Sequence, residues 1–217
     1  MGDAKLNNGA TRFKLTQPKR VIGFLCVFVL VYGLLMSPWP SLGGAYSRIY
    51  RAGAAFLFES FGSKGVVRFE ELSDEEYDTK IVFYSRDQVS PDGKMVPIGF
   101  MRHSARRSAY IYVAFLTALI LATPIRWSRK GWALLWGMIL IHGFIVFNLA
   151  IWILYGFNKE PLSLFTLSPF WKRVLLLAIG VFVRNLTFGL VVCAFIWILV
   201  SFCRVDLSRV KNKGLLI

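Results

Sequence analysis

The sequence predicts an all-α integral membrane protein with a small β insertion: four transmembrane helices, an amphipathic helix and a short antiparallel β-meander. Composition is the first observation, because hydrophobic residues make up 56% of the 217 residues and the mean hydropathy is +0.55, above the about 45–50% apolar content of soluble domains. The second is that these residues gather in runs that can cross a hydrocarbon core of about 30 Å. The third is a stretch between the runs with the residue types of β-strands.

The first apolar run follows a basic tail. Residues 1–20 carry five Lys and Arg, and residues 21–39 are 19 positions without a charge. This arrangement predicts a cytoplasmic tail and transmembrane helix 1. A secretory signal peptide is the alternative, because small residues stand at a suitable cleavage point, Gly43, Gly44 and Ala45. The apolar run is long for a signal peptide, which favours a retained helix.

Residues 40–107 are predicted to form an extracytoplasmic segment with two parts. Apolar residues recur at three- and four-residue spacing from Tyr46 to Phe61, which predicts an amphipathic helix. Residues 66–72, 79–86 and 95–102 are rich in Val, Ile, Phe and Tyr and are separated by turn residues, which predicts three antiparallel strands. Three short strands have little core of their own. We therefore expect the sheet to pack against the amphipathic helix, the membrane surface or another subunit.

Acidic side chains cluster at the first turn of this predicted sheet. A cation site would be the functional interpretation, but the cluster lacks the DxDxDG spacing of a calcium loop. We therefore interpret it as a solvated turn; its members are Glu70, Glu71, Asp74, Glu75, Glu76 and Asp78.

Residues 108–157 are predicted to form a transmembrane hairpin, helices 2 and 3. Its apolar runs, 108–124 and 131–157, contain 17 and 27 residues. Three cations lie in the turn between them, and short basic segments stay in the cytoplasm. The N-terminal tail, this turn and the C-terminal tail together hold 12 Lys and Arg, against three in residues 158–173. The sequence therefore predicts that both termini are cytoplasmic.

The last apolar region, residues 174–203, follows a predicted extracytoplasmic interfacial loop at 158–173 and precedes a basic cytoplasmic tail at 204–217. Only Arg184 and Asn185 interrupt it. One interpretation is a single tilted helix that places Arg184 near the midplane, where a cation needs a partner. We favour the other interpretation, in which only residues 186–203 cross the membrane, as helix 4. Residues 174–183 would then lie along the surface or inside a larger assembly, and Arg184 and Asn185 would lie at the membrane interface.

The basic residues point to a membrane partner. The net charge is +14, but the cations flank apolar runs, whereas a nucleic-acid-binding protein displays them on a soluble face. We therefore expect no nucleic acid partner. The expected partners are the lipid bilayer with its anionic headgroups and other integral membrane subunits.

Candidate site residues are sparse. His142 is the histidine that lies within a predicted span, so it is the candidate cofactor ligand. The cofactor it could bind is a haem or a chlorophyll. Arg184 and Asn185 are the candidate intramembrane or interfacial polar site. Cys26, Cys193 and Cys203 lie in or beside apolar runs without CxxC spacing, so we expect lipid-buried small residues and no metal site.

The layout also resembles a family. The order of one span, a short amphipathic helix, a small strand region and a hairpin opening with YVAFLTALILATP (residues 112–124) is similar to the small membrane proteins encoded beside bacterial exosortases. The likeness covers about residues 20–155. It implies an accessory protein of an envelope-sorting system in the bacterial inner membrane. The exosortases' own Cys, Arg and His motifs do not align onto Cys193, Arg184 and His142.

Three functions follow as hypotheses. The leading one is a non-catalytic accessory or scaffold subunit of a larger integral membrane complex, which docks through its helices and its extracytoplasmic segment. The second is a pigment- or haem-binding subunit of an electron-transfer or photosynthetic complex that uses His142. The third is a membrane-embedded thiol enzyme of an envelope-sorting system, in which His142 would act as base and Arg184 would hold an oxyanion. The sequence identifies no cofactor.

Overall fold

The computed structural model describes residues 18–37, 40–59, 65–72, 74, 76–159 and 167–213. The helices and strands run in the order α1 (Pro18–Met36), α2 (Pro40–Phe58), β1 (Gly65–Glu71), β2 (Thr79–Val89), β3 (Met95–His103), α3 (Ile111–Ala122), α4 (Trp127–Asn158), α5 (Pro169–Ala178) and α6 (Leu186–Lys213). Short π-helical segments precede α3 (Arg106–Tyr110) and follow α5 (Ile179–Val183). Most of the predicted N-terminal tail, residues 160–166 of the predicted interfacial loop and residues 214–217 lie outside the described residues.

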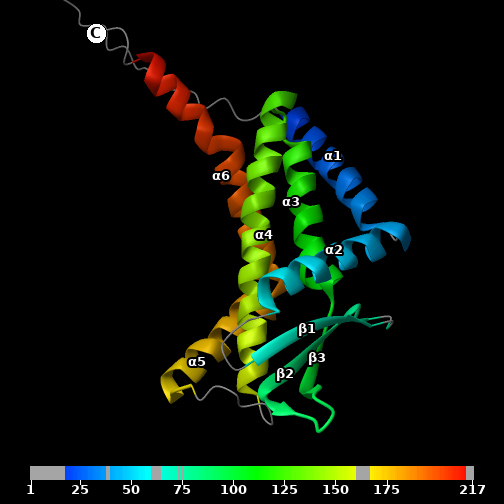
Figure 1. Ribbon diagram of the computed structural model, residues 1–217. Coiled ribbons are helices and arrows are strands. Elements are labelled where there is room, and N and C mark those ends of the chain that lie inside the picture. The colour runs from blue at the N-terminus through cyan, green and yellow to red at the C-terminus, as the bar shows by residue number, and fades with distance from the viewer. Residues whose placement is uncertain are drawn as a thin grey trace, which may run out of the picture.

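Helices α1, α3, α4 and α6 form the bundle, and α3 contacts the other three (Figure 1). Aromatic rings join α1 to α3, where Phe28 and Tyr32 meet Phe115 edge-on with ring centroids 5.5 and 5.8 Å apart. Helix α3 is tied to α6 by the Trp197 indole, which donates a hydrogen bond of 2.7 Å to the Thr123 hydroxyl.

A mostly helical fold with apolar candidate spans is confirmed, but the four predicted transmembrane helices are not. Helices α1 and α4 are each long and apolar enough to cross a membrane, and the pair Pro169–Val183 with Leu186–Ser201 adds a third candidate if its two parts form one span. Helix α3 has only 12 residues. It ends at Ala122 because Thr123 precedes a proline and is extended, with ψ of 129°.

Helix α4 links the bundle to the sheet. Its 32 residues span about 48 Å at 1.5 Å per residue, well beyond a hydrocarbon core of about 30 Å. The excess lies at the C-terminal end, where Leu149, Ile153 and Phe157 are buried against the sheet. Helix α2 lies across this end of the bundle, between the bundle and the sheet (Figure 1).

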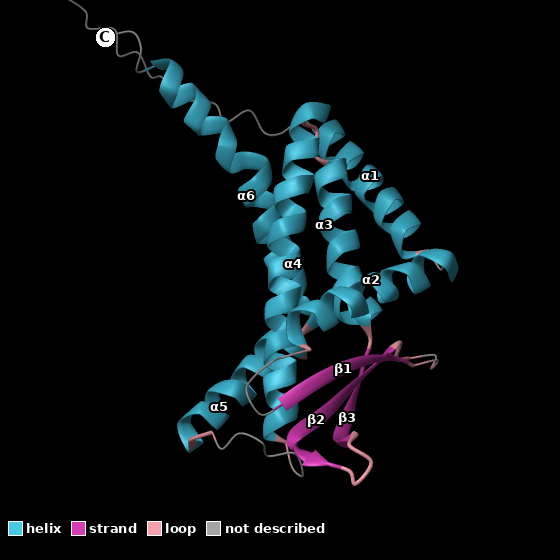
Figure 2. Ribbon diagram, viewed as in Figure 1, coloured by secondary structure: helices cyan, strands magenta, loops and turns pink. Residues whose placement is uncertain are grey.

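The three strands form an antiparallel sheet in the order β1-β2-β3 (Figure 2), so the predicted meander is confirmed. One face is apolar: Val67, Ile81 and Phe83 are fully buried and pack against Ala54 and Phe58 of α2 and the end of α4. We call this unit, α2 with the sheet and the last turns of α4, the head. The sheet therefore packs against the amphipathic helix, which is one of the three packing partners expected. It also packs against the end of α4, which the sequence did not predict.

The opposite face of the sheet carries charged side chains beside apolar and aromatic ones. The Arg68 guanidinium lies 5.3 Å from the centroid of the Tyr84 ring, and the Lys80 ammonium lies 5.1 Å from that of Phe100. Lys80 also pairs with Glu70 at 3.4 Å. Such cation–π and ionic contacts are typical of a solvated surface.

The interruption at Arg184 and Asn185 is a sharp bend. The segments before and after it differ in direction by 70°. The π-helical segment ends where the Arg184 N–H donates to the Ile179 carbonyl at 2.9 Å, and the Asn185 side-chain oxygen then accepts the Phe188 N–H at 3.3 Å. Asn185 thus caps the start of α6. The two parts therefore do not form one straight helix.

Candidate functional site

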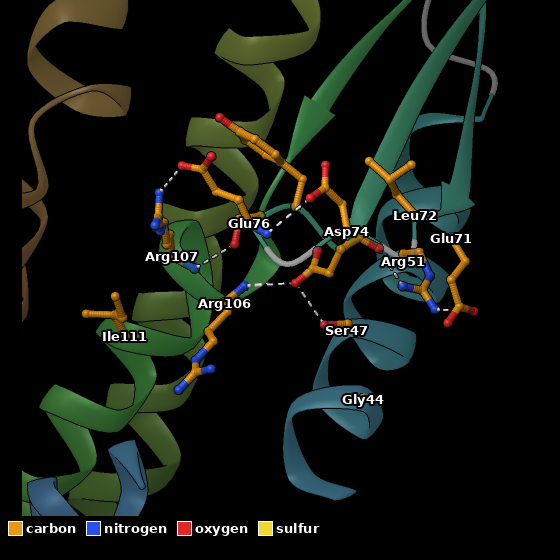
Figure 3. Close-up of a pocket in the computed structure, with 13 residues that line it drawn as sticks. Gly44, Ser47, Arg51, Glu71, Leu72, Asp74, Glu76, Arg106, Arg107 and Ile111 are labelled. Carbon is orange, nitrogen blue, oxygen red and sulfur yellow. Dashed lines mark hydrogen bonds and ion pairs between the residues drawn. The ribbon is translucent and has the colours of Figure 1, made fainter. Parts of the chain in front are cut away.

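A charged crevice of about 520 Å³ lies where α2, the β1–β2 turn and the start of α3 meet (Figure 3). It combines acidic and basic side chains from all three elements. The charged members are Arg51, Glu71, Asp74, Glu76, Asp78, Arg106 and Arg107.

Asp78 organises this crevice. Its carboxylate accepts hydrogen bonds from the Ser47 and Thr79 hydroxyls at 3.0 and 2.8 Å and from the N–H groups of Ala105 and Arg106 at 2.9 and 3.3 Å. The two N–H groups belong to the first helical turn that leads into α3, where backbone donors lack intrahelical partners. One carboxylate therefore joins α2, β2 and the entry to the bundle.

Ion pairs complete the walls. Arg51 of α2 donates to Glu71 of β1 at 3.0 Å and to the Asp78 carbonyl at 3.0 Å. Arg107 donates to Glu76 at 2.7 Å across the opposite wall. The outer members of these pairs are exposed, so the pairs fix geometry more than they add stability.

Arg106 has a different environment. Its backbone N–H is bound to Asp78, but its guanidinium points away from the carboxylates (Figure 3). Within the described part of the chain, the structure gives this guanidinium no ion pair. Among the described residues of the crevice, Arg51 and Arg107 form ion pairs and Arg106 does not.

A stacked, partly buried pair lies behind the crevice. The Tyr50 hydroxyl and His103 Nε2 are 2.9 Å apart, and the two rings stack with an interplanar angle of 15°. Burial lowers the pKa of His103 to about 4, although the nearby Asp78 acts in the opposite direction. Burial likewise raises the pKa of Tyr50, with smaller contributions from Tyr46 and Asp78. His103 is therefore neutral near pH 7.

His142 lies outside the crevice, on an exposed face of α4. Its Nδ1 is 2.8 Å from the Met138 carbonyl oxygen one turn earlier. It borders an apolar groove of about 280 Å³ between α2 and α4, which we call the groove; its lining also includes Tyr46, Ile49, Gly53, Leu57 and Val146.

The other predicted site residues lie apart. Cys193 is buried and its thiol donates to the Tyr112 carbonyl at 3.6 Å, whereas Cys26 is exposed on α1. Arg184 and Asn185 are exposed at the bend. Among the described hydrogen bonds, His142 bonds to Met138 and Cys193 to Tyr112, so neither bonds to another predicted site residue. The side chain of Cys203 lies outside the described residues. Among the His, Cys, Asp and Glu residues that the structure describes, no group could hold a metal ion.

Sequence reasoning missed the central role of Asp78, which it grouped with five other acids in a solvated turn. No local pattern distinguishes Asp78 from its neighbours, because its partners Ser47 and Ala105 stand 31 and 27 residues away. Comparison of the chain with protein-family models, curated sequences and solved structures gave no significant match.

Proposed function

We propose that this protein is a non-catalytic accessory subunit that scaffolds or stabilises a larger integral membrane complex. The bundle lies in the bilayer of a bacterial inner membrane, with both termini cytoplasmic and the head on the extracytoplasmic side. The partners are other integral membrane subunits and anionic lipid headgroups. The basic turn at residues 124–131, which joins α3 to α4, is at the end of the bundle away from the head (Figure 1), and this is compatible with the orientation.

The observation that carries the proposal is the crevice. It is open, it is fixed by Asp78 and Arg51, and it presents the guanidinium of Arg106, which makes no ion pair with the described residues. Complementary charges between subunits contribute to specificity and orientation. A carboxylate on an extracytoplasmic loop of a neighbouring subunit is the partner group that Arg106 suits best.

The sheet itself contributes less to docking than its size suggests. Its apolar face is covered by α2 and α4 of the same chain, so it needs no partner to bury that face. Docking is therefore assigned to the crevice and to the exposed faces of the bundle.

The test is purification of the tagged chain from its native membranes in mild detergent. We expect an integral membrane partner to co-migrate, and Arg106→Glu to lower its recovery about fivefold or more, since loss of a central interface Arg costs above about 1 kcal/mol. Arg86→Glu is the matched control, because Arg86 is also exposed but lies on β2 away from the crevice. A wild-type chain that purifies only as a stable monomer would refute the proposal.

The pigment- or haem-binding function is the second candidate, and the position of His142 beside the groove favours it. A haem held by two histidines does not fit, because His103 is buried and bound to Tyr50. The groove, at about 280 Å³, is also below the about 300–1,000 Å³ of pockets for larger ligands. Visible absorption of the native complex that survives His142→Ala unchanged would eliminate this candidate.

A further inference from the structure

The groove between α2 and α4 has the features of a site for a small membrane-soluble ligand. Its lining is apolar apart from His142 and the tyrosines of α2. Two of its apolar lining residues on α2 are exposed, Ile49 at 71% and Leu57 at 51%. With the bundle placed in the bilayer as proposed, these side chains face hydrocarbon, and the groove then opens to the bilayer.

Its depth agrees with this environment. His142 follows Gly131, where the apolar run begins after the cations of the basic turn, by about 16 Å at 1.5 Å per residue. In a hydrocarbon core of about 30 Å that begins near Gly131, His142 lies close to the midplane. This step rests on the proposed placement of the bundle in the bilayer.

The hydrogen-bonding state of His142 follows from its geometry. A carbonyl oxygen only accepts, so the 2.8 Å contact between Nδ1 and the Met138 carbonyl places the proton on Nδ1. In the neutral ring the other nitrogen, Nε2, is then an acceptor. An acceptor in an apolar environment favours a ligand that brings a hydroxyl donor.

The volume limits the ligand's shape. About 280 Å³ suits a slender chain better than a macrocycle. We propose that the groove binds a single-chain lipid alcohol, whose hydroxyl donates to His142 Nε2 and whose apolar chain lies against α2 and α4.

The experiment uses the purified full chain in nanodiscs of synthetic phosphatidylcholine. The probes are a photoreactive, alkyne-tagged C16 alcohol and its methyl ether, which has the same chain without the donor. We expect saturable labelling of α2 and α4 by the alcohol, about 2- to 10-fold above the ether, the range that one hydrogen bond of 0.5–1.5 kcal/mol provides. His142→Phe should lower the alcohol's labelling to the level of the ether, and His142→Gln, which retains an acceptor, should restore part of the difference.

A steric variant tests the groove independently of the histidine. Gly53 lines the groove and an added Cβ there would meet nothing within 4 Å, so Gly53→Leu should fill part of the groove and lower labelling by both probes. Gly33→Leu is the matched control, because Gly33 also lies in a helix with no atom within 4 Å of an added Cβ, but on α1; it should leave labelling unchanged.

Either of two outcomes would overturn the inference: equal labelling of the wild-type chain by alcohol and ether, or labelling by the alcohol that does not saturate. The ether comparison needs no variant, so it is decisive even if a substitution prevents folding. No partner subunit is present in these nanodiscs, so failure here is distinct from failure of the accessory-subunit proposal.

Discussion

Replacing Asp78 with alanine should weaken the connection between the head and the bundle. The substitution removes the acceptor of four hydrogen bonds, which come from Ser47 of α2, from Thr79 of β2 and from the N–H groups of Ala105 and Arg106 at the entry to α3. These donors lie in three separate elements. No single remaining side chain in the crevice can replace the carboxylate at all of them.

The magnitude follows from the number of bonds and their exposure. A net hydrogen bond contributes about 1 kcal/mol, and a helix N-cap alone contributes about 0.5–2 kcal/mol. The contacts with Asp78 are only partly buried or exposed, so water satisfies some donors after the substitution. We therefore expect Asp78→Ala to lower the free energy of unfolding by about 2–4 kcal/mol, or Tm by about 5–15 °C for a chain of this length.

Thermal unfolding in mild detergent measures the change, and amide hydrogen exchange at Ala105 and Arg106 localises it. Asp78→Asn keeps an acceptor oxygen and should lose about half as much stability. Asp87→Ala is the control, because Asp87 is exposed on β2 and its side chain makes no hydrogen bond with the described residues. The reasoning is wrong if Asp78→Ala and Asp87→Ala unfold within about 1 °C of each other, or if exchange at Ala105 and Arg106 is unchanged.

Two further predictions concern His103 and Gly156, which lie in the head. Burial lowers the pKa of His103 from 6.5 to about 4. Between these two pH values the unfolded chain binds a proton at His103 and the folded chain does not. The contribution to the free energy of unfolding is therefore full above about pH 6.5 and falls by up to about 3 kcal/mol as the pH is lowered toward 4. His103→Gln should remove this component in unfolding measurements at pH 7.5 and 4.5, and an unchanged pH dependence would contradict it. Gly156→Ala should destabilise by about 1–3 kcal/mol, because its Cβ would meet the Phe83 ring and lie 2.9 Å from Met101 Sδ. Gly143→Ala on the same helix meets nothing within 4 Å and should be neutral or slightly stabilising; equal Tm values for the two variants would refute this.

Local features of the fold were readable from the sequence. The strands at 66–72, 79–86 and 95–102 correspond to β1, β2 and β3, because residue type and turn spacing act over a few positions. The amphipathic helix corresponds to α2 for the same reason, since its period of 3.6 is visible in one short window. The long apolar runs likewise mark α1 and α4 as candidate spans.

The site residues show the limit of such reasoning. Sequence alone selected His142 as an unusual residue in an apolar run, but its acceptor nitrogen and its groove depend on Met138 and on α2. It selected Asn185 as a candidate polar site, whereas the structure uses its side chain to cap α6. It did not select Asp78 at all.

The sequence by itself determined that apolar helices alternate with a polar segment of strands, because hydropathy and periodicity are local properties. Only the tertiary structure decided that α4 continues from the bundle into the head, that α2 and α4 cover the sheet, and that Asp78 joins three elements. The physical reason is distance along the chain. A contact such as that between Ser47 and Asp78 depends on where α2 and β2 lie after folding, and neither residue's neighbours in the sequence carry that information.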